Sequence, residues 1–200
     1  MRSRFKPWAK SYLEEHEEFV RFSADDLPKA NALEIGSGKG DFAVSYAKAN
    51  PDKRIIAIER DTSISGLFAK KVVEAELKNL ILIPVDLDLV YEGLAKNRFE
   101  AIYLNFSDPW PKKKHAKRRL TFAPRLKRIA DLLEEDGMIA LKTDNDNLFE
   151  FTKEQAAEIG LTIAKEEWDY PGEEGDFMTE YERHFRSEGQ PIHRLILKKQ

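Results

Sequence analysis

The sequence has no cysteine among its 200 residues and only four scattered histidines. Disulfides, thiolate-bound zinc, iron–sulfur clusters and a thiol nucleophile are therefore excluded. No stretch approaches the roughly 18 apolar residues of a membrane span, and the N-terminus lacks the apolar core of a signal peptide. These absences predict a metal-independent, cytoplasmic protein with no membrane partner.

Acidic residues outnumber basic ones over most of the chain, and basic residues are concentrated in one stretch. The net charge is −3, yet residues 112–128 hold nine Lys or Arg and no acid, which leaves −12 for the rest. A smaller basic group, Arg2, Arg4, Lys6 and Lys10, opens the chain beside Trp8. A basic patch on an acidic body indicates polyanion binding at one face. Taken alone, the basic run is equally well interpreted as a solvated helix face.

Strand and helix signals alternate along the chain. Apolar runs predict strands at 32–35, 54–59, 80–85, 99–105 and 138–142, with late strands at 161–168 and 192–198. Helices are expected at 41–49, at 62–77 with Thr62 as its cap, and at 145–159. A basic helix of about 15 residues should join the fourth and fifth strands. The repeated βα units predict a doubly wound parallel sheet in one domain, residues 1–200, with a basic arm and helix at 1–28.

A glycine loop follows the first predicted strand. Gly36, Gly38 and Gly40 have G-x-G-x-G spacing, with Glu34 before them and Asp41 after. A dinucleotide site requires G-x-G-x-x-G and an open helix N-terminus for pyrophosphate. Carboxylates around the loop would repel pyrophosphate but suit a cationic ligand such as S-adenosylmethionine.

Two further acids end the next strands. Glu59 lies 23 residues after Gly36, where a ribose-binding acid falls in nucleotide folds, and Asp86 could accept from an adenine amine. Any one acid could be an ordinary solvated strand end. Together with Glu34, Gly36 and Gly38 they predict a cofactor site at the carboxyl edge of the sheet.

The segment N-F-S-D-P-W-P at 105–111 leads directly into the basic run. Asp108 could accept hydrogen bonds from a base edge, and the cations that follow could hold phosphates. Trp110 either stacks on a base or packs the turn between its two prolines. This combination predicts chemistry on a nucleobase.

With these motifs placed, the chain resembles the bacterial tRNA (guanine-N7-)-methyltransferases, which modify guanosine 46 in the tRNA variable loop. The resemblance rests on blocks spread over nearly the whole chain: K-P-W-A at 6–9, E-I-G-S-G-K-G at 34–40, Y-L-N at 103–105 through K-K at 112–113, 115–119, K-T-D-N at 142–145, M-T-E-Y-E at 178–182 and G-Q-P-I at 189–192. His193 stands where tyrosine is expected, and the N-terminal arm is short. These departures leave open how the RNA is gripped.

The resemblance implies a seven-stranded, mostly parallel Rossmann-like methyltransferase sheet with an antiparallel late strand. It implies S-adenosylmethionine as cofactor, S-adenosylhomocysteine as product, and tRNA as partner. Glu34, Glu59, Asp86 and Asp108 would contact the cofactor or the reaction centre. Substrate contacts would come from Lys112, Asp144, Thr179, Glu180, Tyr181 and Glu182. RNA contacts would come from Lys114, His115, Lys117, Arg118 and Arg119. The choice between monomer and homodimer stays open.

Guanine N7 has an in-plane lone pair and no proton, so methyl transfer to it requires alignment and no general base. We expect Asp108 to act catalytically by binding a guanine donor edge and countering the charge that moves onto the base.

Structural acids or helix caps are the alternatives for Asp108 and Asp144, and a short capped helix is the alternative to a lid at 179–182. Rival functions are an amino-directed methyltransferase, whose D/N-P-P-Y/F loop D-P-W partly matches, and a noncatalytic tRNA-binding module. A dehydrogenase fits worst.

Overall fold

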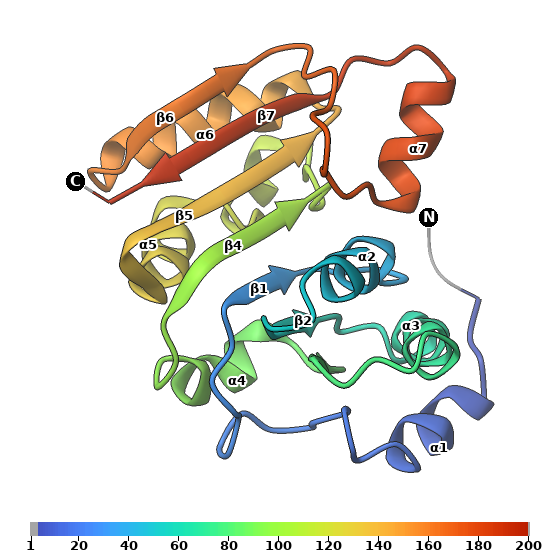
Figure 1. The fold of residues 1–200 in the computed structure, drawn as a ribbon. Helices are drawn as coiled ribbons and strands as arrows, with labels where there is room; N and C mark the ends of the chain where they lie inside the picture. Colours follow the sequence, from blue (N-terminus) through green and yellow to red (C-terminus); the bar gives the residue numbers. More distant parts are fainter. Residues whose placement is uncertain (1–3, 200) are drawn as a thin grey trace. The chain divides into compact units, whose positions relative to one another are not determined.

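The computed structural model describes residues 4–199 and divides the chain into two compact units (Figure 1). The first unit contains the residues up to Arg98 together with Phe177–Glu180. The second contains Phe99–Asp176 and the chain from Tyr181 onward. Arg2, part of the predicted N-terminal basic group, lies outside the described residues. Within them, no helix combines the length and apolar character needed to cross a bilayer.

Three short parallel strands form the sheet of the first unit. β2 (Ile55–Ile58) pairs with β1 (Ala32–Ile35) on one side and with β3 (Leu80–Ile83) on the other. All twelve of their residues are buried, as expected for strands covered on both faces. Four helices accompany them: α1 (Trp8–Glu14), α2 (Asp41–Ala49), α3 (Thr62–Glu74) and α4 (Leu87–Leu94).

The sheet of the second unit is mixed. β4 (Phe99–Asn105) runs parallel to β5 (Leu133–Thr143), which pairs antiparallel with β7 (His193–Lys198). β7 in turn pairs antiparallel with β6 (Thr162–Glu167). The helical segments of this unit are the 3-10 helix η1 (Lys113–Arg118), α5 (Ala123–Asp131), α6 (Asp146–Glu158) and most of α7 (Glu180–Ser187).

The seven strands follow the order β3-β2-β1-β4-β5-β7-β6, mostly parallel with antiparallel late strands. The predicted fold class is therefore confirmed. Most predicted elements agree with the structure to within a few residues, because buried strands and amphipathic helices have strong local patterns.

Four local predictions were wrong. The basic helix is broken: a 3-10 helix carries the lysines, and α5 begins at Ala123 with Pro124 in its first turn. Ala116 is the only apolar residue of the segment 112–119, too few for an amphipathic face, so the lysines lie on a tight 3-10 helix whose residues are exposed or half-buried. β5 begins at Leu133, which pairs with Phe99 before a register shift.

The cap of α3 is Asp61, whose side chain accepts from Ile64 N–H at 3.0 Å, and not Thr62. α4 was not predicted at all. It is short, and the acid that begins it, Asp86, was interpreted as a ligand residue or a solvated strand end and not as a helix cap.

Candidate active site

The glycine loop after β1 adopts backbone conformations that glycine alone adopts readily. Gly36, Gly38 and Gly40 have φ of 77°, 55° and 77°. A Cβ at Gly40 would lie 2.1 Å from the Phe68 ring, so this glycine allows α3 to pack closely. A Cβ at Gly36 or Gly38 would meet no atom within 4 Å. The loop is thus tightly packed at its end and open along the two glycines that we predicted to bind the cofactor.

Glu59 is fixed against this loop by backbone hydrogen bonds. Its Oε2 accepts from Gly38 N–H at 3.0 Å and its Oε1 from Asp61 N–H at 2.9 Å. Burial raises the pKa of the Glu59 carboxyl above its ordinary value of 4.5, while the two backbone bonds oppose that shift. A desolvated carboxylate held in one orientation can accept hydrogen bonds from ligand hydroxyls with little rearrangement.

Two more predicted acids lie at the same edge of this sheet. Glu34 is fully buried in β1, one residue before the strand ends. Asp86 follows β3 and caps α4, accepting from Asp88 N–H at 3.0 Å, and Arg60 lies 3.5 Å from its other oxygen. Because the three strands are parallel and in register, their carboxyl ends bring Glu34, Glu59 and Asp86 to one edge.

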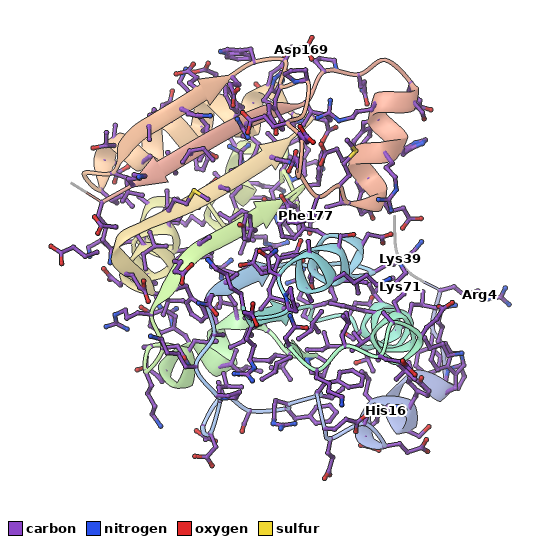
Figure 2. The ribbon with its side chains drawn as sticks, viewed as in Figure 1. Arg4, His16, Lys39, Lys71, Asp169 and Phe177 are labelled. Carbon is purple, nitrogen blue, oxygen red and sulfur yellow. The ribbon has the colours of Figure 1, made fainter. Side chains whose placement is uncertain are left out.

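The segment 177–180 belongs to the first unit, although it lies far in sequence from the rest of that unit. The Phe177 ring lies edge-on to the rings of Phe42 and Tyr46 on α2, with centroids 5.9 Å apart in both pairs. Figure 2 labels Phe177 and Lys39, both next to α2. Lys39 of the glycine loop forms an ion pair with Glu180 at 2.8 Å. Thr179 and Glu180, predicted to bind substrate, therefore lie beside the glycine loop. Sequence reasoning missed Lys39 and Phe177, although both sit inside or next to quoted motifs.

In the second unit, the residues 106–111 form the Asp108 loop after β4. Two of its aromatic residues have left-handed backbone, Phe106 with φ 51° and Trp110 with φ 40°. Such conformations are uncommon for bulky residues and cluster at functional sites. Phe106 N–H donates to the Lys142 carbonyl at 2.8 Å, and the Asp108 side chain is exposed.

Lys142, two residues before the predicted substrate residue Asp144, lies in a buried charge network. Its ammonium contacts Asp176 at 2.5 Å and Glu182 at 3.1 Å, and Glu182 also accepts from Arg186 at 2.8 Å. Glu182 has 0% exposure. Its neighbour Tyr181 is 56% exposed. The four letters T-E-Y-E therefore have different environments, and Glu182 holds α7 to β5 in this structure.

The basic run presents most of its cations to solvent. No residue of η1 is buried, and the side chains of Lys112, Lys114, Lys117 and Arg118 are exposed. Trp110 lies among them, with the Arg118 guanidinium 4.9 Å from its ring centroid and His115 edge-on at 5.8 Å. Arg119 is different, because it is buried, and burial lowers the pKa of its guanidinium from the ordinary value.

Each unit therefore gathers its own group of predicted residues. The first holds Glu34, Gly36, Gly38, Glu59, Asp86, Thr179 and Glu180. The second holds Asp108, Lys112, Lys114, His115, Lys117, Arg118, Arg119, Asp144, Tyr181 and Glu182. Their assigned roles stay predictions.

Comparison with known sequences identifies relatives over the full chain. The model of a family described as "Putative methyltransferase" matches residues 28–195. A tRNA (guanine-N(7)-)-methyltransferase of Bacillus subtilis is 39% identical, covering 97% of this chain and 97% of the relative. The protein of the same name from Bacillus cytotoxicus is 40% identical, covering 99% of this chain and 97% of the relative.

Solved structures show the same fold at low sequence identity. An antibiotic-related methyltransferase has a TM-score of 0.63 at 16% identity, covering 97% of this chain and 96% of that one. The 16S rRNA methyltransferase KamB has a TM-score of 0.62 at 16% identity, covering 99% and 96%. These likenesses support the Rossmann-like methyltransferase fold.

Proposed function

This chain belongs to the tRNA (guanine-N7-)-methyltransferase family, and from that membership we propose that it methylates N7 of guanosine 46 in the variable loop of tRNA. The observation that carries the proposal is the end-to-end likeness to proteins of that name, at 39% and 40% identity. A tRNA substrate also suggests that the protein works in the cytoplasm.

S-adenosylmethionine fits the residues of the first unit. The space along Gly36 and Gly38 admits a ligand close to the backbone, and the carboxylates at the strand ends suit a cation. Glu34 would hold the amino acid portion, Glu59 the ribose hydroxyls and Asp86 the adenine amine, with Asp108 near the methyl group. When bound, the cofactor supplies an electrophilic methyl group on a positively charged sulfur.

The chain has to align the two reactants and stabilise moving charge. Guanine N7 attacks with its own lone pair, so no side chain needs to remove a proton. Asp108 would accept hydrogen bonds from the guanine N1–H or amino group, orienting N7 toward the methyl group. Its negative charge would also stabilise the purine as that base becomes positive.

Substrate contacts would extend from this centre to the RNA backbone. Asp144 is the second candidate for binding the guanine donor edge, and Lys112, Thr179, Glu180 and Tyr181 would contact the substrate around it. Lys114, His115, Lys117 and Arg118 would bind phosphates, which could offset the few kcal/mol needed to extrude a base. For Glu182 to contact substrate, it would have to exchange its bonds to Lys142 and Arg186.

The test is incubation with labelled S-adenosylmethionine and unmodified tRNA, followed by nucleoside mapping. The expected product is 7-methylguanosine at position 46, and a transcript with adenosine at that position should accept no label. Methyladenosine would identify an amino-directed enzyme instead. Binding of tRNA without transfer would identify a noncatalytic module.

A further inference from the structure

Arg119 stands apart in the basic run because its side chain is turned into the protein. It is 8% exposed, whereas the side chains of Lys114, Lys117 and Arg118 are exposed. We propose that Arg119 is a positioning residue that fixes the Asp108 loop, and that it is not an RNA contact. Only the catalytic consequence rests on the proposed function, since the loop contacts belong to the free protein.

The guanidinium of Arg119 clamps two successive carbonyl groups of the Asp108 loop. Nε donates to the Pro109 carbonyl at 2.8 Å, and Nη2 donates to the Trp110 carbonyl at 3.3 Å. These carbonyls follow Asp108 directly in the chain. The rigid donor fork of arginine can reach both at once, which a single lysine ammonium cannot do with the same geometry.

Two prolines limit the backbone hydrogen bonds that the Asp108 loop can form around Trp110. Trp110 has φ 40° and lies between Pro109 and Pro111, neither of which has an N–H to donate. The loop therefore cannot form regular backbone pairing, and a left-handed conformation at a tryptophan persists only where surrounding contacts impose it. The Arg119 bonds supply such contacts at the residue itself.

Arg119 is in turn held on its other side. Its guanidinium lies 4.3 Å from the ring centroid of Phe151 on α6, and its backbone N–H donates to Ala116 at 3.0 Å. The clamp thus connects the loop to a helix of the same unit. Binding a phosphate would require the guanidinium to leave two carbonyls and an aromatic ring, while exposed cations nearby need no such exchange.

The test compares Arg119→Lys with Arg98→Lys. Arg98 is the matched control, because it is exposed, bonds backbone carbonyls at the end of α4, and is no part of the proposed machinery. Arg119→Lys keeps the charge and is expected to fold. Hydrogen–deuterium exchange of peptides spanning 104–116 should accelerate in Arg119→Lys and stay unchanged in Arg98→Lys.

Kinetics supply the second readout. Arg119→Lys should lower kcat by about 10- to 100-fold through misplacement of Asp108, while the Kd for tRNA changes less than about twofold. Unchanged exchange in Arg119→Lys would overturn the proposal, and so would a loss of tRNA affinity as large as that of Lys117→Ala with kcat intact. If the wild-type protein methylates no tRNA, the proposed function fails, whereas the exchange result still decides the clamp.

Discussion

At the scale of single residues, Asp108 has the most direct chemical role in the proposal. It is exposed on a loop that contains two aromatic residues with left-handed backbone, and Arg119 bonds two carbonyls of that loop. Its carboxylate would act mainly on the charge that develops during transfer, and such groups affect kcat more than ground-state binding.

Asp108→Ala should therefore reduce the single-turnover methylation rate by about 100-fold or more, with tRNA affinity within a few fold of wild type. Rapid-quench measurements at saturating tRNA would give the rate, and filter binding the affinity. Asp108→Asn is the control variant that keeps the volume while removing the charge. Equal losses of rate and affinity in Asp108→Ala would contradict the catalytic role.

Glu59 should make cofactor affinity depend on pH. Burial raises its pKa above 4.5, so its protonated fraction increases earlier than usual as the pH falls. Ribose hydroxyls would donate to the ionised form, so S-adenosylhomocysteine should bind more weakly as acidification reaches the raised pKa. Calorimetry from pH 7.5 to 5 should show this decline in the wild type.

Glu59→Gln is the matching variant, since it cannot ionise. It should bind S-adenosylhomocysteine about tenfold or more weakly at pH 7.5, because bonds to a charged acceptor contribute about 1.5–3 kcal/mol, and it should lack the pH dependence. Because the same pKa is raised in the folded protein, the protonated carboxyl of Glu59 stabilises the fold. This contribution to stability is fully present below the pKa of the unfolded state and is lost as the pH rises through the higher pKa of the folded state. If the affinity for S-adenosylhomocysteine declined with pH in the same way in both proteins, the assignment of Glu59 to the ribose would be contradicted.

At the scale of elements, α7 and the loop before it are held to β5 by Lys142. This lysine is 5% exposed and lies between Asp176 and the fully buried Glu182. Removing one partner from a buried ion pair leaves charge without compensation, which is among the larger effects of single substitutions.

Lys142→Met should lower the free energy of unfolding by about 3–5 kcal/mol, as measured by urea denaturation. The double variant Lys142→Met with Glu182→Gln should lose less than the sum of the single losses, by about 1–3 kcal/mol. Lys127→Met is the control, because Lys127 and Asp131 form an exposed pair at 2.8 Å that should contribute at most about 1 kcal/mol. Additive losses in the double variant would show that the two side chains do not stabilise each other.

At the scale of the whole molecule, the uneven charge distribution should govern tRNA binding. The net charge is −3, but the exposed cations of 112–118 lie together on and beside η1. Phosphate binding by these cations would release counterions, so affinity should fall steeply with salt.

The plot of log K against log salt concentration has a negative slope. The double variant Lys114→Ala with Lys117→Ala should make this slope less steep by about 1.4–1.8, since each phosphate contact contributes about 0.7–0.9. Lys165→Ala, which removes an exposed lysine on β6, should leave the slope unchanged. Titrations of tRNA binding at salt concentrations from about 50 to about 300 mM would measure this slope. A slope that is the same in all three proteins would exclude the run as the RNA contact.

Local sequence patterns determined the strands, the glycine loop and the acids at the strand ends. In β2 and β3, four-residue apolar runs between turn residues are decisive, because a strand buried on both faces needs mostly apolar side chains. Parallel pairing then requires that the acids after these runs share one edge. The resemblance to a methyltransferase family likewise depended on short blocks of neighbouring residues, although these blocks are spread over nearly the whole chain.

Only the tertiary structure decided which way individual charged side chains face. Arg118 and Arg119 are adjacent and chemically identical, yet one is exposed and the other bonds the carbonyls of Pro109 and Trp110. Glu180 pairs with Lys39, whereas Glu182, two residues later, is buried against Lys142. The partners of these side chains lie up to 141 residues away, and a sequence pattern that repeats every few residues carries no information on such contacts.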